Sequence, residues 1–240
     1  MPDISVGCCG FPGAMARYWE RFPVVEVQKT FYRPPRLQTA ERWRREAPAG
    51  EFTLKAWQLI THEPSSPTYR KVGPEYDPQR KERYGSFRGT EEVWEAWRTT
   101  RGIAQALQAK AVVFQCPASF TPTEENMRNL AGFFSRLRGE SIRLAWEPRG
   151  PWPEDTVREL CRKFDLVHCV DPLAARPLWG ELCYFRLHGL GGYRYRYTDE
   201  DLHSLRGKLP AGKPCYVMFN NVFMEEDARR FRALLGLPEA

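Results

Sequence analysis

The chain has 240 residues, of which 42% are hydrophobic, 28% charged and 13% aromatic, and its formal net charge is +6. These values exclude a disordered or collagen-like chain and a mini-protein held together by disulfides, and the charge permits binding to phosphates without requiring it. We find no basic, apolar leader and no apolar run near the roughly 18 residues of a membrane-spanning helix. We therefore expect a cytoplasmic protein without a membrane partner.

Short apolar or β-branched runs alternate with stretches of helical periodicity along the whole chain. The runs predict eight strands, at residues 4–8, 24–28, 52–56, 111–116, 143–147, 166–170, 183–188 and 214–220. Repeated βα units in a chain of this length favour one TIM-like (β/α)8 barrel over an open doubly wound sheet. We expect this barrel to form a single domain over residues 1–240.

Helix starts carry side-chain acceptors for the free backbone N–H groups. The segment 121–124, Thr-Pro-Thr-Glu, predicts a capping box with Pro122 at the first helical position. Pro153 and Thr198 predict the starts of two further helices.

One connection, residues 59–90, is much longer than the short loops that usually follow a barrel strand. Its basic residues are Arg70, Lys71, Arg80, Lys81, Arg83 and Arg88. Long loops in compact domains usually cover or shape a site, or else are loosely ordered. We expect this basic insertion after the third strand to lie over the carboxyl-terminal face of the barrel.

Polar residues stand at the ends of nearly all the predicted strands, where TIM-barrel enzymes hold their active sites. They are Glu26, Gln28, Lys55, Gln115, Glu147, Arg149, Asp171, Arg186, His188 and Asn220. Charges inside a buried parallel strand are costly unless they are paired. We expect the three carboxylates and three cations to meet at the barrel mouth as a mutually neutralising network.

The predicted chemistry is acid–base catalysis on a small polar, anionic substrate, including phosphorylated ones, in a hydrolase or lyase. Glu147 is the candidate general acid or base, His188 shares the proton transfer, and Lys55 polarises an anionic oxygen. Glu26 is the fourth candidate catalytic residue. The residues predicted to bind the substrate are Arg186, Gln115, Asn220, Gln28, Asp171, Arg149, Tyr195 and His62. The alternative is that these charges only satisfy one another.

Metal and thiol chemistry receive less support. Glu26, Glu147, Asp171 and His188 are possible metal ligands, but the chain has only four histidines, so we assign no metal and identify no cofactor. The seven cysteines form no CxxC pair. Those at strand ends, Cys8, Cys9 and Cys116, are either packing residues or, beside a cation, nucleophiles.

Tyrosine and arginine alternate over residues 193–197, directly after the seventh strand. Aromatic rings stack on bases and arginine binds phosphate. Together with the insertion at 59–90, this Tyr/Arg loop supports an alternative function, a nucleic-acid-binding or metal-assisted phosphodiester-hydrolysing protein. The competing interpretation is a loop whose tyrosines pack and whose arginines are solvated.

Several strand motifs, in order, resemble those of the YecE-like family, domain of unknown function 72. They are VEVQKTFY at 25–32, FTLK at 52–55 with Thr61-His62, FQCPASF at 114–120, AWE at 145–147, YFRLHG at 184–189 and YVMFNN at 216–221. The resemblance implies a barrel related to the TIM fold and no established reaction. The positions that carry over are Glu26, Lys55, Gln115, Glu147, Arg186, His188 and Asn220.

The chain departs from that family's pattern at three places. Residues 7–13, GCCGFPG, replace a start resembling Gly-Trp-Ser-Tyr, Gln28 replaces an asparagine, and Pro148 stands inside a triplet that resembles Glu-Phe-Arg in the family. The contribution of the first strand to the site is therefore not implied by the resemblance.

Overall fold

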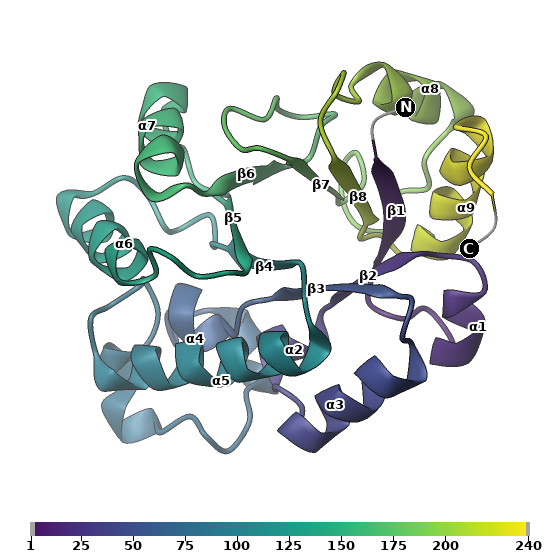
Figure 1. The fold of residues 1–240 in the computed structure, drawn as a ribbon. Helices are drawn as coiled ribbons and strands as arrows, with labels where there is room; N and C mark the ends of the chain where they lie inside the picture. The colour runs from purple at the N-terminus through teal and green to yellow at the C-terminus, as the bar shows by residue number, and fades with distance from the viewer. Residues whose placement is uncertain (1–2, 239–240) are drawn as a thin grey trace.

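A computed structural model describes residues 3–238, in which eight parallel strands close into a barrel in chain order (Figure 1). The strands are β1 (Ile4–Cys9), β2 (Val24–Val27), β3 (Glu51–Lys55), β4 (Ala111–Gln115), β5 (Arg143–Glu147), β6 (Val167–Val170), β7 (Cys183–Leu187) and β8 (Cys215–Phe219). The last strand pairs with the first and closes the sheet. The predicted (β/α)8 barrel is confirmed.

The helices surround the outside of the barrel (Figure 1). They are α1 (Met15–Trp19), α2 (Lys29–Tyr32), α3 (Leu37–Glu46), α4 (Gln58–Thr61), α5 (Glu91–Leu107), α6 (Glu124–Arg136), α7 (Glu154–Phe164), α8 (Asp199–Gly207) and α9 (Met224–Leu234), with the 3-10 helices η1 (Pro67–Lys71) and η2 (Pro78–Arg83). No helix within residues 3–238 is long and apolar enough to cross a membrane.

Strand alternation divides the apolar residues into two layers. On β7, Cys183, Phe185 and Leu187 belong to the layer between barrel and helices, whereas Tyr184 belongs to the layer inside the barrel. Because side chains two apart share a face, Arg186 also points inward. The same alternation turns the polar residues of the strand ends toward one another.

Close contact between β1 and β2 depends on Gly7, which stands opposite Val24. A Cβ atom at Gly7 would overlap the carbonyl oxygen of Val24. Only glycine therefore allows the two backbones this approach, a use of the residue that is common where chains pass closely.

The helix starts are partly as expected. At α8, Thr198 and Asp201 form a complete capping box. At α6 the prediction is wrong, because the helix begins at Glu124 and its N-cap is Thr123, whose hydroxyl accepts a hydrogen bond from Asn126 N at 3.2 Å. Thr123, and not Thr121, caps the helix because its extended backbone directs the hydroxyl at the third helical N–H group.

The segment 59–90 contains the end of α4 and both 3-10 helices. The Tyr76 ring packs edge-on against Tyr69 and Tyr84, with centroids 5.0 and 5.1 Å apart. Arg83 Nε donates to Glu92 of α5 at 2.7 Å, which fastens the segment to the outer helices. That it covers the barrel mouth stays a prediction.

Candidate active site

Arg186 is the centre of a polar network inside the barrel, and its side chain has no exposed surface. Its Nε donates to Glu26 Oε2 at 3.0 Å and its Nη2 donates to Glu26 Oε1 at 2.9 Å. Its Nη1 donates to Gln115 Oε1 at 3.1 Å and to Glu147 Oε2. All three guanidinium nitrogens of Arg186 are therefore engaged by side chains of β2, β4 and β5.

Two carboxylates secure the charge of Arg186. Burial alone would lower the pKa of its guanidinium, but Glu147 and Glu26 outweigh burial and hold that pKa well above its ordinary value. Tyr184 adds a hydrogen bond to Glu26 Oε2 at 2.9 Å, and Gln28 Nε2 donates to Glu26 Oε1. Glu26 is thus enclosed by donors, as a buried carboxylate requires.

Glu147, which ends β5, is 3% exposed and accepts hydrogen bonds from four side chains. Besides Arg186, they are Arg149 Nε at 2.7 Å, His188 Nε2 at 3.0 Å and the Cys169 thiol at 4.0 Å. Burial would raise the pKa of this carboxyl, but Arg186 and His188 hold it well below its ordinary value. Glu147 consequently remains a carboxylate at neutral pH.

His188, directly after β7, joins Glu147 to the next strand. Asn220 Nδ2 lies 3.0 Å from His188 Nδ1, and the backbone N–H of His188 donates to Asp171 Oδ2 at 3.1 Å. Burial lowers the pKa of His188, so its ring is neutral at pH 7. With the proton on Nε2, the ring donates to Glu147 and accepts from Asn220, which satisfies every partner.

Lys55, at the end of β3, lies outside this set of hydrogen bonds. Its Nζ stands over the Phe31 ring, 3.3 Å from the centroid. Burial, followed by the nearby charge of Arg186, lowers the pKa of Lys55 to about 7. A ring face attracts a desolvated cation by about 2 kcal/mol, less than the several kcal/mol that desolvation costs.

His62 is placed beside Lys55 by the same aromatic ring. Its imidazole meets the Phe31 ring edge-on, with centroids 4.9 Å apart, and Nδ1 lies 2.8 Å from Thr61 Oγ1. Burial and the Lys55 charge lower the pKa of His62 to about 3, so this ring too is neutral at pH 7.

A pocket of about 390 Å³ opens at the ends of β5, β6 and β7. Glu147 and His188 line it, together with Arg149, Arg176 and Trp152. Glu154 and Asp171 line it as well, and Arg176 pairs with Glu154 at 3.0 Å. The pocket therefore brings three carboxylates, two imidazole rings, two guanidinium groups and an aromatic wall to one space. This combination suits a small polar ligand.

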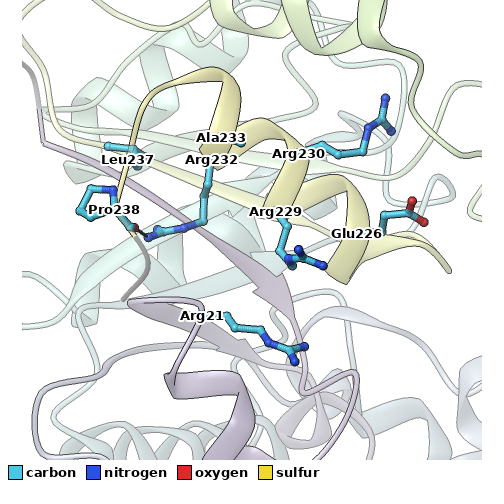
Figure 2. A pocket seen from close by; sticks show the side chains of 8 residues that line it. All are labelled: Arg21, Glu226, Arg229, Arg230, Arg232, Ala233, Leu237 and Pro238. Carbon is cyan, nitrogen blue, oxygen red and sulfur yellow. Dashed lines mark hydrogen bonds between the residues drawn. The ribbon is translucent and has the colours of Figure 1, made fainter.

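A second pocket, of about 340 Å³, lies outside the barrel between α9 and the end of α1 (Figure 2). It is rich in arginine, but Arg230 pairs with Asp227 and Arg21 pairs with Glu225. None of the residues singled out from the sequence lines it. Arg21 thereby links the end of α1 to α9, whereas the Arg230 pair lies within α9.

The structure brings together most of the sequence-predicted site residues. Glu26, Gln28, Gln115, Glu147, Arg149, Arg186, His188 and Asn220 share hydrogen bonds, and Asp171 fixes the backbone of His188. Tyr195 stands apart, because its hydroxyl donates to Asp201 Oδ2 at 2.7 Å. Sequence reasoning missed Tyr184 and Phe31; Tyr184 was signalled by its spacing of two from Arg186.

The side chains of the Tyr/Arg loop, residues 193–197, differ in how much of their surface is exposed. Tyr193 is 65% exposed, whereas Tyr197 is buried and its hydroxyl accepts a hydrogen bond from Gly189 N at 2.7 Å. Arg196 pairs with Glu226. Tyr197 therefore cannot stack on a base, which corrects its part in the nucleic-acid interpretation.

The cysteines and a metal site can be assessed from the same geometry. Burial raises the pKa of Cys8, Cys9 and Cys116, so these thiols remain protonated at neutral pH and are poor nucleophiles. Within residues 3–238, no group of three or more His, Cys, Asp or Glu side chains is arranged to hold a metal ion. Glu26 and Glu147 instead direct their oxygens at Arg186.

Solved structures with this fold share little sequence with the chain. It is similar to a DUF72 family protein of Enterococcus faecalis V583, with 19% identity, 99% of each chain covered and a TM-score of 0.72. It is also similar to a DUF72 family protein of Thermotoga maritima MSB8, with 21% identity, 98% of this chain and 99% of that chain covered, and a TM-score of 0.67. For a family 2 AP endonuclease of Brucella melitensis the identity is 12%, the coverage is 98% of each chain and the TM-score is 0.56. These likenesses show the fold alone.

Family membership rests on a match over most of the chain. No curated protein matches this chain. The family model described as a protein of unknown function, DUF72, matches residues 12–240, and this confirms the resemblance seen in the ordered strand motifs. The chain therefore belongs to the DUF72, or YecE-like, family.

Proposed function

We propose that this protein is an enzyme that performs acid–base chemistry on a small polar, anionic substrate at the carboxyl-terminal mouth of its barrel. The observation that carries the proposal is the contact between Glu147 Oε1 and His188 Nε2, 3.0 Å apart, in the wall of the 390 Å³ pocket. Characterised TIM-barrel enzymes place their chemistry at this face. Hydrolase or lyase stays the predicted reaction class.

His188 is the residue that moves the proton. Its ring is neutral at pH 7, and its Nδ1 becomes the acceptor when substrate replaces the amide of Asn220. The Glu147 carboxylate then stabilises the imidazolium that forms, as the buried carboxylate of a catalytic triad does. Because the pKa of Glu147 lies well below its ordinary value, Glu147 acts through His188. This narrows the sequence-based hypothesis, in which Glu147 is itself the acid or base.

The substrate's charge is matched by Arg149 and Arg176. Both line the pocket, where Arg149 pairs with Glu147 and Arg176 pairs with Glu154. Their side chains are nevertheless 37% and 72% exposed, so the remaining guanidinium N–H groups are accessible to an incoming carboxylate or phosphate. Arg186 is given a different role from the substrate binding predicted for it. Its three nitrogens already hold Glu26, Glu147 and Gln115, so it positions the network.

Proton transfer is tested with a panel of compounds that spans several reaction classes. Purified protein in D2O is given a set of hydroxy acids, keto acids and sugar phosphates, and NMR records deuterium incorporation and product formation. We expect at least one compound to react, and His188→Gln to slow that reaction about 100-fold, the usual scale of general acid–base catalysis. Tyr193→Phe, outside the network, serves as the matched control. Absence of any reaction, or a loss below about threefold in His188→Gln, contradicts the proposal.

Nucleic-acid binding is the second candidate. Tyr193 and Arg194 are exposed in the loop that follows the carboxyl-terminal end of β7. Lys71 and Lys81 are exposed on the 59–90 segment. One solved neighbour carries the name AP endonuclease, although that likeness shows only the fold. Fluorescence anisotropy with single- and double-stranded DNA and RNA at two salt concentrations tests this function. Binding that weakens steeply with salt supports it, and no binding at low salt ends it.

A further inference from the structure

Lys55 is a buried amine without an anionic partner. It is 6% exposed, and within residues 3–238 its Nζ makes no hydrogen bond and no ion pair. In the described residues, Lys55 Nζ is not one of the side-chain nitrogen and oxygen atoms that are both fully buried and without a hydrogen-bond partner. Because it has no such partner, it must keep some accessible surface. Buried lysines are otherwise almost always paired.

Arg186 is the reason that Lys55 has no partner. The carboxylates with the strongest influence on Lys55 are Glu147 and Glu26, and both direct their oxygens at the Arg186 guanidinium. A guanidinium holds carboxylates in a two-pronged geometry that an ammonium does not offer. The network is therefore complete without Lys55, and Arg186 faces it as a second cation.

The remaining surroundings of Lys55 are apolar or neutral. The Phe31 ring lies under its Nζ, and the neutral His62 ring packs on the edge of Phe31. Cys9, whose thiol is protonated, is a further titratable group near Lys55. A lysine that is desolvated and placed beside another cation is the arrangement that activates the amine as a nucleophile. Consistently, the pKa of Lys55 is lowered to about 7.

We propose that Lys55 is a nucleophile that forms an imine with a small aldehyde or ketone bearing a negative charge. This inference rests on the proposed function, because Lys55 ends β3 at the same carboxyl-terminal end of the barrel at which Glu147 ends β5, although Lys55 is not among the residues that line the 390 Å³ pocket. Lys55 thereby changes from a group that polarises an oxygen to one that bonds covalently to the substrate carbon.

The step balances without any added oxidant or reductant. The free amine of Lys55 attacks the carbonyl carbon, an N–C bond forms, and the carbonyl oxygen takes up a proton to give a carbinolamine. That hydroxyl leaves as water while the nitrogen lone pair forms the C=N bond. Overall, the lysine ammonium and the carbonyl compound yield a protonated imine and one water. The protonated imine draws electrons from the neighbouring carbon, which makes a proton there easier to remove.

Reductive trapping tests the inference on the full chain. The protein is incubated at pH 7 with glyoxylate, or with pyruvate, in the presence of cyanoborohydride, and the labelled lysine is identified by peptide mass spectrometry. About half of an amine with a pKa near 7 is unprotonated at this pH, against fewer than about one in a thousand for an ordinary lysine. We expect labelling of Lys55 to exceed that of the exposed Lys29, Lys71 and Lys81 at least about tenfold.

Two variants serve as controls. Lys55→Arg removes the label, since a guanidinium forms no imine under these conditions, whereas Lys71→Arg, at an exposed lysine that also lies near an aromatic ring, leaves it unchanged. The wild-type peptide map decides the matter even if Lys55→Arg fails to fold. Labelling spread over the exposed lysines, with Lys55 no more labelled than they are, overturns the inference.

The two proposals fail separately. Deuterium exchange that depends on His188, without labelling at Lys55, overturns the imine and leaves the proposed acid–base function intact. Labelling at Lys55 in a protein that exchanges no protons supports the nucleophile and overturns the role given to His188.

Discussion

Glu26 and Arg186 face each other inside the barrel through two hydrogen bonds, Nε to Oε2 at 3.0 Å and Nη2 to Oε1 at 2.9 Å. Neither side chain has exposed surface. The attraction within such a pair offsets the cost of removing both charges from water, and the loss of one partner leaves the other uncompensated. The stability of the barrel interior therefore depends on the pair being complete.

Replacement of Arg186 by leucine removes that compensation from two carboxylates at once. We expect Arg186→Leu to lower the free energy of unfolding by about 3–5 kcal/mol, measured by urea denaturation. Arg98→Ala is the control, because Arg98 pairs with Glu91 at an exposed site and its loss changes stability by about 1 kcal/mol or less. Equal effects of the two substitutions would show that the buried network does not hold the barrel together.

The approach of β1 to β2 is tested at Gly7. A methyl group there overlaps the Val24 carbonyl, so Gly7→Ala is expected to lower the free energy of unfolding by about 3 kcal/mol, the upper end of ordinary overpacking costs. Gly102, inside α5, is the matched control, since a Cβ there meets no atom within 4 Å. Gly102→Ala is expected to raise stability by about 0.5–1 kcal/mol. Thermal or urea unfolding of both variants provides the measurement, and a stable Gly7→Ala protein contradicts the geometry.

The lowered pKa of Lys55 makes stability depend on pH. Its folded pKa is about 7, against about 10.4 in an unfolded chain, so between these values the unfolded chain binds more protons and stability rises with pH. Between these values, Lys55 makes the free energy of unfolding rise by about 1.4 kcal/mol per pH unit. This slope disappears as the pH falls through 7, because Lys55 is then protonated in both states. Urea unfolding between pH 7 and 8.5 should show this slope in the wild type and lose it in Lys55→Met.

The other charges around Lys55 do not account for such a slope. The pKa of Glu147 is lowered and that of Arg186 raised, so both keep their charges across the window, and the raised pKa of Cys9 keeps that thiol neutral. If the difference in stability between the wild type and Lys55→Met stays constant from pH 7 to 8.5, Lys55 has its ordinary pKa in the fold.

Tyr197 and Tyr193 belong to one loop but are predicted to differ in their effect on stability. Tyr197→Phe leaves the Gly189 N–H without its acceptor, at an expected cost of about 1–3 kcal/mol. Tyr193→Phe removes a hydroxyl from a ring that is 65% exposed, and we expect a change within about 0.5 kcal/mol. Calorimetric unfolding of both variants compares them directly, and a neutral Tyr197→Phe would show that the Gly189 N–H does not depend on this hydroxyl.

The sequence allowed the barrel and the members of its polar network to be predicted, because period-two spacing places alternate strand residues on one face. Glu26, Glu147 and Arg186 follow from this spacing together with their places near the strand ends. Their pairing was not predictable, because reach between strands far apart in the chain decides which cation holds the carboxylates. Lys55 and Arg186 look equivalent in the sequence, yet of the two only Arg186 pairs with both acids, Glu26 through two nitrogens and Glu147 through one.

Local rules were also insufficient where two residues competed for one role. Thr121 and Thr123 are both suitable caps, and the backbone angles at Thr123 decide between them. Asp171 illustrates a different limit. Its place directly after the sixth predicted strand suggested a substrate ligand. Its oxygens instead accept hydrogen bonds from the backbone N–H groups of Leu173 and His188, a contact that depends on how the chain turns after β6.

The pairing of β1 with β8 has a consequence for synthesis on the ribosome. One edge of β1, residues Ile4–Cys8, has no strand to pair with until Cys215–Phe219 of β8 has left the ribosome. For most of its synthesis, the unfinished sheet therefore has two unpaired edges, one at β1 and one at the strand made last. Nascent chains released before β8 is made are therefore expected to associate with one another through these edges.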